Sequence, residues 1–147
     1  MAVGSAGGLL YRLGPGLEVL LVHPGGPFWK NKDEGAWSIT KGEVAPGEDP
    51  RGRALIEFAE ETGSDLRDAD LRELGEIRQK GGKVVVAFAA EGDLDAGATV
   101  SNTFELEWPP RSGRRQEFPE VDRAEWFALD EARRRINAAQ AAFLDRL

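Results

Sequence analysis

Residues 42–63, GEVAPGEDPRGRALIEFAEETG, constrain the fold more than any other stretch of this chain. Asp49 followed by Pro50 is a typical helix start, because an Asp side chain accepts hydrogen bonds from free amides and proline fits the first helical position. Gly63 suits the left-handed conformation that ends many helices. The segment therefore predicts a loop followed by a helix that ends near Gly63.

One face of this helix carries three carboxylates. Glu57, Glu60 and Glu61 have the spacing i, i+3 and i+4, which places them on one side of a helix. Like charges at this spacing repel one another. A cluster of carboxylate oxygens is also the kind of site that Mg²⁺ and Mn²⁺ prefer. The spacing alone fits either a solvated acidic face or a metal site.

The composition is that of an ordinary globular protein. The 147 residues are 41% hydrophobic and 31% charged, which is enough for one domain with a hydrophobic core. The net charge of −7 argues against binding to a nucleic-acid polymer, although a divalent cation could bridge the protein to a small phosphorylated ligand. With no cysteine and His23 as the single histidine, disulfides, thiolate sites and multi-histidine sites are excluded. His23 is expected to be structural.

The first residues of the chain lack the basic region of a signal peptide, and glycines interrupt their apolar stretch. No apolar run approaches the length of a membrane span. We therefore expect a cytoplasmic protein with no membrane partner. Because no linker or repeat is evident, residues 1–147 are expected to form a single domain.

Strands and helices are expected to form a layered α/β domain. The turn 14–16 predicts a hairpin between the first two strands, and Gly81-Gly82 separates another pair. The apolar run 84–89 is expected near the centre of the sheet. The strands are expected at residues 7–13, 18–23, 37–40, 71–79, 83–91, 104–108 and 124–129.

The remaining segments are expected to be helical or irregular. Leu55, Phe58 and Thr62 lie on one stripe of the first helix and are expected to face the core. A second helix is expected to start with Asp130 as its cap and to run towards Leu147. Between them, residues 109–119 are expected to form a long basic loop.

The spacing within residues 42–63 resembles the signature of the Nudix hydrolases. That signature reads Gly, five residues, Glu, seven residues, then Arg-Glu-apolar-x-Glu-Glu-x-Gly-apolar. The resemblance implies a Nudix-type α/β/α sandwich with a mixed β-sheet. Seven of the nine defined positions match in this chain, namely Gly42, Glu48, Glu57, Phe58, Glu60, Glu61 and Gly63.

Two positions depart from the signature. Ser64 stands where the family has an apolar residue, and Ile56 stands where it has arginine. In the family, that arginine holds the loop by pairing with an acidic residue such as Glu48. Since Ile56 cannot form such a pair, the sequence leaves this loop without its arginine anchor.

The resemblance implies a metal site on the helix. Glu57 and Glu61 would bind the metal directly, Glu60 directly or through water, and the backbone carbonyl of Gly42 would complete the shell. Glu48 is a catalytic candidate as an additional or indirect ligand. The metal, Mg²⁺ or alternatively Mn²⁺, would neutralise charge on a pyrophosphate and activate a water for attack at phosphorus.

A carboxylate would then act as general base. It could be a glutamate of the signature such as Glu60, or one in the loop before the last strand. Glu120 lies where similar diadenosine polyphosphate hydrolases carry an extra glutamate, and Glu117 is the neighbouring alternative. Both could instead simply keep a proline-rich loop soluble.

Lys41-Gly42 resembles the Pro-Lys-Gly of the dinucleoside polyphosphate and diphosphoinositol branches, with Thr40 in place of the proline. Lys41 is therefore a candidate phosphate contact, and an ordinary exposed lysine is the alternative. Trp29 could stack on a nucleobase or serve as a packing anchor.

The loop arginines could clamp a polyphosphate chain through charge-assisted bonds, or merely balance nearby glutamates. They are Arg111, Arg114 and Arg115, of which Arg115 is the substrate-binding candidate.

These features predict a Mg²⁺-dependent Nudix pyrophosphohydrolase that cleaves a diphosphate linkage in a nucleoside polyphosphate derivative. Dinucleoside polyphosphates are the first substrate class, and nucleoside triphosphates are the alternative. A low-activity nucleotide-binding or regulatory module is a second hypothesis, favoured by Ile56 and opposed by the retained glutamates. The expected partner is a small-molecule nucleotide, for a monomer or homodimer. Neither a P-loop nor a GxGxxG dinucleotide fingerprint occurs.

Overall fold

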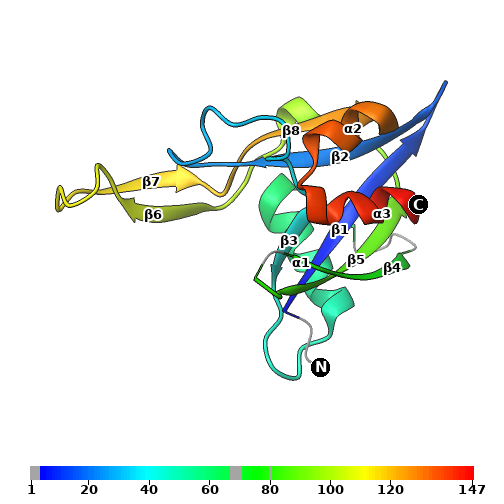
Figure 1. The fold of residues 1–147 in the computed structure, drawn as a ribbon, viewed down its shortest axis with the longest axis horizontal. Helices are drawn as coiled ribbons and strands as arrows, with labels where there is room; N and C mark the ends of the chain where they lie inside the picture. Colours follow the sequence, from blue (N-terminus) through cyan, green and yellow to red (C-terminus); the bar gives the residue numbers. More distant parts are fainter. Residues whose placement is uncertain (1–3, 67–70, 80) are drawn as a thin grey trace.

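A computed structural model describes residues 4–66, 71–79 and 81–147. Its centre is a six-stranded mixed sheet in the order β4-β5-β1-β2-β8, with β3 also paired to β1. Helix α1 covers one face of the sheet, and α2 and α3 cover the other (Figure 1). The predicted α/β sandwich with a mixed sheet is confirmed. The strands of the sheet are β1 Ser5–Leu13, β2 Leu17–Pro24, β3 Thr40–Glu43, β4 Arg72–Arg78, β5 Val84–Glu91 and β8 Val121–Ala128.

Strand β1 organises the sheet because it pairs with three other strands. Residues 5–8 pair antiparallel with β3, residues 11–13 pair antiparallel with β2, and residues 5–11 pair in parallel with β5. Gly7 permits the approach of β3, since a Cβ there would lie 2.1 Å from the carbonyl oxygen of Thr40. The predicted β1–β2 hairpin, the antiparallel β4–β5 pair and the central position of β5 are all confirmed.

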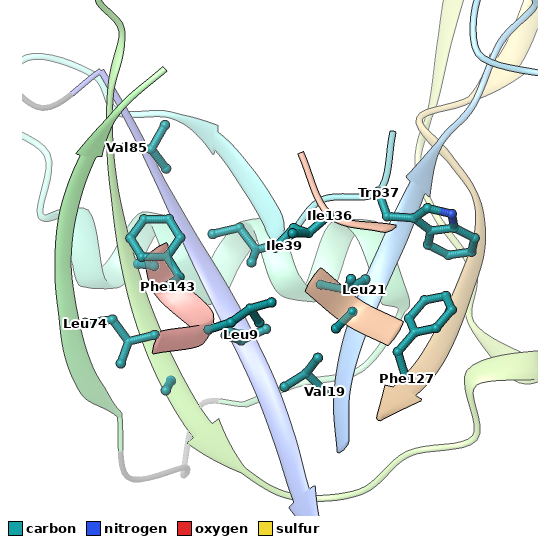
Figure 2. Close-up of a cluster of buried hydrophobic side chains, with 14 residues drawn as sticks. Leu9, Val19, Leu21, Trp37, Ile39, Leu74, Val85, Phe127, Ile136 and Phe143 are labelled. Carbon is teal, nitrogen blue, oxygen red and sulfur yellow. The ribbon is translucent and has the colours of Figure 1, made fainter. Parts of the chain in front are cut away.

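The core lies on both faces of the sheet, as the two-residue period of the strands requires. Leu9, Leu21 and Phe143 belong to the cluster between the sheet and helices α2 Leu129–Arg135 and α3 Ala141–Asp145 (Figure 2). Leu10 and Phe58 belong to the cluster under helix α1 Pro50–Thr62. Within the described residues, no helix is long and apolar enough to cross a membrane.

The segment 109–119 is not the long loop that the sequence predicted. Its second half forms β7 Arg115–Pro119, which pairs antiparallel with β6 Thr103–Glu107. This hairpin projects from the body of the protein (Figure 1). Phe104 and Phe118 face each other across the pair with ring centroids 6.0 Å apart. The charged side chains of β7 hide the strand signal, because a two-stranded arm needs little apolar sequence.

The expected C-terminal helix is also interrupted. Ile136 has extended backbone angles and ends α2, and the amide of Asn137 donates a hydrogen bond to the carbonyl of Trp37 at 2.7 Å. A 3₁₀ turn, η2 Ala138–Gln140, then leads into α3. Asp130 lies in the first turn of α2 and is not its cap. The backbone contact with a distant segment outweighs local helix propensity here.

Smaller differences concern two other segments. The predicted strand 37–40 joins the sheet only from Thr40, whereas Trp37 and Ser38 make isolated bridges to Ile136 and Val22. On α1, Leu55 is half-buried rather than part of the core. A further 3₁₀ turn, η1 Ala96–Ala98, follows β5.

The core position of α3 leads to a stability prediction. Phe143→Ala should lower the free energy of unfolding by about 3–5 kcal/mol, because it leaves a cavity at a fully buried aromatic position. Urea denaturation measures the change. Leu13→Ala, at a side chain that is 66% exposed, is the control and should alter stability by less than about 0.5 kcal/mol. Equal effects of the two substitutions would contradict the packing of α3 into the core.

Candidate active site

Helix α1 begins and ends where the sequence predicts. The Asp49 side chain accepts a hydrogen bond from the amide of Arg51 at 3.3 Å, and Pro50 occupies the first turn. Gly63 has φ 78° and its amide donates to the carbonyl of Ala59 at 2.8 Å. These local signals fix the register of the helix, and the register decides which glutamates face β3.

Glu61 is one of these glutamates and is buried, with 7% of its surface exposed. Its Oε2 accepts a hydrogen bond from the backbone amide of Lys41 at 3.3 Å. Burial raises the pKa of Glu61 to about 8, the charges of Glu57 and Glu120 add to the rise, and the contacts with Lys41 oppose it. A carboxylate with this pKa favours either a proton or a cation at neutral pH.

Glu57 packs directly against the backbone of Gly42. A Cβ at position 42 would lie 1.7 Å from Oε1 of Glu57, so only glycine leaves room for this carboxylate. Burial raises the pKa of Glu57 to about 7, and the contact with the Glu60 carboxyl adds to the rise because two carboxylates share a hydrogen bond only when one is protonated. The charge of Arg53 opposes this shift.

The second carboxylate oxygen of Glu57 is the strongest indication of a cation site. Oε2 is buried and has no hydrogen-bond partner among the residues that the structure describes. A buried carboxylate oxygen without a partner is destabilising, and a hard divalent cation is a ligand that satisfies it. The donor set of Glu57, Glu60 and Glu61 therefore fits such a cation. Across residues 4–66, 71–79 and 81–147, no three acidic, histidine or cysteine side chains are already arranged to hold a metal, so binding would require side-chain rotation.

A pocket of about 340 Å³ opens beside these carboxylates. It brings together four of the residues singled out in the sequence, because Trp29, Lys41, Glu61 and Glu120 all line it. Burial lowers the pKa of Lys41, and the Lys83 charge adds to this effect.

The backbone of Glu120 is fixed at both ends. Its amide donates to the carbonyl of Asn102 at 2.8 Å, and its carbonyl accepts from the amide of Gly25 at 2.9 Å. Glu61 and Glu120 therefore line the same pocket as the Lys41 ammonium group, a combination that suits a metal-bound phosphate.

A polar wall of the pocket was not predicted from the sequence. Gln140 is fully buried, and its Oε1 accepts from the amide of Ile39 at 3.0 Å. Its Nε2 donates to Oγ of Ser38 at 3.0 Å and to Oε1 of Gln79 at 3.1 Å. This polar wall is formed by segments far apart in the chain, so no local sequence pattern predicts it. Its residues are Ser38, Gln79 and Gln140.

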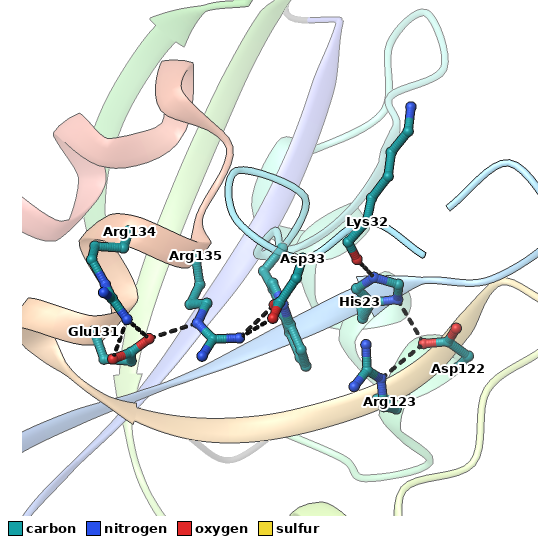
Figure 3. Close-up of polar contacts among 9 residues, drawn as sticks. His23, Lys32, Asp33, Asp122, Arg123, Glu131, Arg134 and Arg135 are labelled. Atoms are coloured by element: carbon teal, nitrogen blue, oxygen red, sulfur yellow. Dashed lines mark hydrogen bonds and ion pairs between the residues drawn. The ribbon is translucent and has the colours of Figure 1, made fainter. Parts of the chain in front are cut away.

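Residues around His23 attach the loop between β2 and β3 to the body (Figure 3). His23 is fully buried, its Nε2 donates to the carbonyl of Lys32 at 2.6 Å, and its Nδ1 lies 2.8 Å from Oδ1 of Asp122. Asp33 accepts a hydrogen bond from Nε1 of Trp37 at 2.8 Å and pairs with Arg135. The loop carries Trp29 to the pocket, so this network fixes one rim of the site.

Three candidates lie outside the residues that line the pocket. Arg115 is exposed on the β6–β7 hairpin, where it pairs with Glu105 at 3.1 Å, and it does not line the pocket. Glu48 lies in the loop before α1, and both of its carboxylate oxygens accept hydrogen bonds from Arg53. Glu117 is exposed on β7 and faces Glu105 across the hairpin.

Comparison with known proteins agrees with this geometry. Residues 4–147 match the sequence model of the NUDIX domain. The chain therefore belongs to the Nudix family. Its assignment to the Nudix hydrolase family, made above from the glutamate signature, is confirmed.

Solved structures share the fold. An Ap4A hydrolase from C. elegans, in a binary complex, aligns with a TM-score of 0.66 and 22% identity over 97% of this chain and 93% of that chain. The NUDIX domain of NrtR from Shewanella oneidensis, complexed with ADP-ribose, aligns with a TM-score of 0.67 and 16% identity. The alignment covers 99% of this chain and 86% of that chain. The C-terminal domain of mouse MUTYH, in complex with human PCNA, aligns with a TM-score of 0.60 and 18% identity. The alignment covers 97% of this chain and 84% of that chain. No curated protein matches the sequence significantly.

The buried carboxylates predict how the metal-free protein responds to pH. The pKa values of about 7 for Glu57 and about 8 for Glu61 lie above the ordinary value of 4.5. Their contribution to stability is therefore complete below the unfolded pKa and is lost as the pH rises through 7 to 8. In EDTA, the melting temperature should fall between about pH 6 and about pH 8.5, and it should fall less in Glu61→Gln because the amide stays neutral. The same fall in both proteins would contradict the burial of an ionised Glu61.

Proposed function

We propose that this Nudix hydrolase binds Mg²⁺, with Mn²⁺ as an alternative, and hydrolyses a diphosphate linkage in a nucleoside polyphosphate. The main support is the buried Oε2 of Glu57, which has no partner among the described residues. Glu57 interacts electrostatically with Glu61, which lines a pocket with Lys41 and Glu120. Acidic and basic groups that converge in this way suit a metal-bound phosphate chain.

Glu57 and Glu61 would hold the cation, with Glu60 as a third carboxylate and the carbonyl of Gly42 as a neutral oxygen. Bound there, the cation would neutralise charge on the diphosphate and lower the pKa of a water molecule. Lys41 would bind a phosphate oxygen with its ammonium group, while its backbone amide keeps Glu61 in place.

Glu120 is the proposed general base, because it lines the same pocket and its backbone is fixed at both ends. It would take a proton from the attacking water as the new phosphorus–oxygen bond forms. The bond to the departing phosphate breaks in the same displacement, and that phosphate leaves as an anion. Glu60 is the alternative base. Arg115 is left outside these roles because it lies on the hairpin.

Dinucleoside polyphosphates remain the first substrate class, supported by the Lys41-Gly42 context, Glu120 and the fold shared with a C. elegans Ap4A hydrolase. The pocket volume of about 340 Å³ favours one specific alternative. It is small for a ligand pocket and would enclose about one nucleoside half. A second nucleoside would extend past Trp29, which is 39% exposed, whereas a nucleoside triphosphate would need no such extension.

A turnover assay tests the proposal. Diadenosine polyphosphates, nucleoside triphosphates, ADP-ribose and diphosphoinositol polyphosphates are each incubated with and without Mg²⁺, and phosphate or nucleotide release is measured. Glu61→Gln should lower kcat/KM on the order of 100-fold or more, because it removes a metal-binding charge. Glu125→Gln, at an exposed position on β8, should leave the rate unchanged.

The two rival hypotheses give different results in this assay. Undiminished turnover by Glu61→Gln would contradict the metal role of the α1 glutamates. No turnover in the panel, together with retained Mg²⁺ binding, would favour the regulatory module.

The substitution Gly42→Ala should weaken metal binding without destabilising the fold. The new methyl group would overlap the end of the flexible Glu57 side chain, so this side chain should move while the backbone stays in place. We expect a change in unfolding free energy of less than about 1 kcal/mol. Affinity for Mn²⁺, measured by calorimetry, should fall about tenfold or more.

Gly52→Ala is the matched control on α1, where the nearest atom to a new Cβ lies 3.8 Å away. It should keep the Mn²⁺ affinity of the wild type. Equal affinities in all three proteins would refute the contact between Gly42 and Glu57 as a feature of the metal site.

A further inference from the structure

An arginine one turn before the glutamate cluster holds the loop between β3 and α1. Nε of Arg53 donates to both carboxylate oxygens of Glu48 at 3.0 Å each, and its Nη2 donates to Oε2 at 2.7 Å. The two side chains are 24% and 23% exposed. An exposed ion pair with a single contact contributes little to stability, whereas this forked arrangement fixes both direction and distance.

Glu48 transmits this contact to the rest of the loop. Its Oε1 also accepts from the amide of Ala45 at 2.9 Å, and its own amide donates to the carbonyl of Ala45 at 3.0 Å. The amide of Val44 donates to the carbonyl of Gly4 at 3.1 Å, which ties the start of the loop to the residue just before β1. Arg53 therefore links the first turn of α1 to a loop whose other end is bonded to Gly4, beside β1.

The same loop leads directly back to the candidate metal site. It follows β3, whose residue Gly42 lies against the carboxylate of Glu57. Arg53 and Glu57 are spaced i and i+4 on α1, so both lie on the side of the helix that faces the loop.

We propose that Arg53 is a positioning residue for the metal site, and that it supplies from one turn earlier the loop anchor that Ile56 cannot supply. This inference rests on the function proposed above. It corrects the expectation that the loop lacks an arginine anchor, because Glu48 is paired with an arginine in the structure. Ile56 itself is 43% exposed and lies three residues further along the helix.

The test begins with loss and matched control. Arg53→Ala should raise the Mn²⁺ dissociation constant, and the metal concentration for half-maximal rate, roughly tenfold or more. Arg51→Ala removes a cation from the same helix turn while keeping the Glu48 pair, and should behave as the wild type. Arg53→Lys should be intermediate, because lysine cannot make the forked contact.

A second experiment moves the arginine to another position on the helix and asks whether Mn²⁺ affinity returns. Arg53→Ala combined with Ile56→Arg returns an arginine to the exposed position one turn later, at i+3 on the same side of the helix. We expect the double variant to regain most of the Mn²⁺ affinity that the single variant loses. A loss that arises from general destabilisation would not be restored in this way.

Hydrogen exchange in the metal-free protein separates this inference from the proposed function. Backbone amides within residues 43–49 should exchange about tenfold or more faster in Arg53→Ala than in Arg51→Ala. The exchange rates of amides in the strands of the sheet outside this segment should be the same in both variants. This readout requires no turnover, so it remains informative if the wild type is inactive on every substrate. Equal exchange and equal Mn²⁺ affinity in Arg53→Ala and Arg51→Ala would overturn the role of Arg53.

Discussion

The close approach of β3 to helix α1 is the constraint on which the site depends. Because Gly42 has no side chain, the Glu57 carboxylate lies between the two elements in the space that a Cβ at position 42 would fill. The consequence is burial of charge, which raises the pKa values of Glu57 and Glu61 to about 7 and about 8. Burial of the Glu57 and Glu61 carboxylates therefore destabilises the metal-free fold, and a bound cation would offset this destabilisation.

The remainder of the structure holds the surroundings of this place rigid from two sides. On one side, Arg53 and Glu48 fix the loop that leads out of β3. On the other, His23 and Asp33 attach the loop between β2 and β3 to β8 and α2. Gln140 joins the pocket wall to the backbone of Ile39. The charged and the neutral parts of the pocket are thus held by separate sets of hydrogen bonds.

Features encoded by neighbouring residues could be read from the sequence, and those encoded by distant contacts could not. The limits of α1 follow from Asp49 and Gly63, which act on the backbone beside them. The end of α2 depends instead on Asn137 bonding to the Trp37 carbonyl, a contact between segments about a hundred residues apart. The polar pocket wall is hidden for the same reason, because Gln140 bonds to Ile39 and Gln79, which lie far from it in the chain. Strand β7 pairs with its neighbour β6 and is hidden instead by its charged side chains.

The pairing of Glu48 shows why a sequence signature can miss a retained interaction. A helix presents residues i and i+3 on the same side, and arginine is long enough to reach one carboxylate from either position. The side chain at position 56 therefore says less about the loop than the presence of any arginine on that side. Ile56 then ceases to favour a regulatory module with little turnover. A module that never bound a cation would also be more stable with an amide at Glu61, since the amide would remove a buried charge without changing the side-chain shape. Retention of the carboxylates together with the Arg53 anchor favours an enzyme whose site is completed by metal.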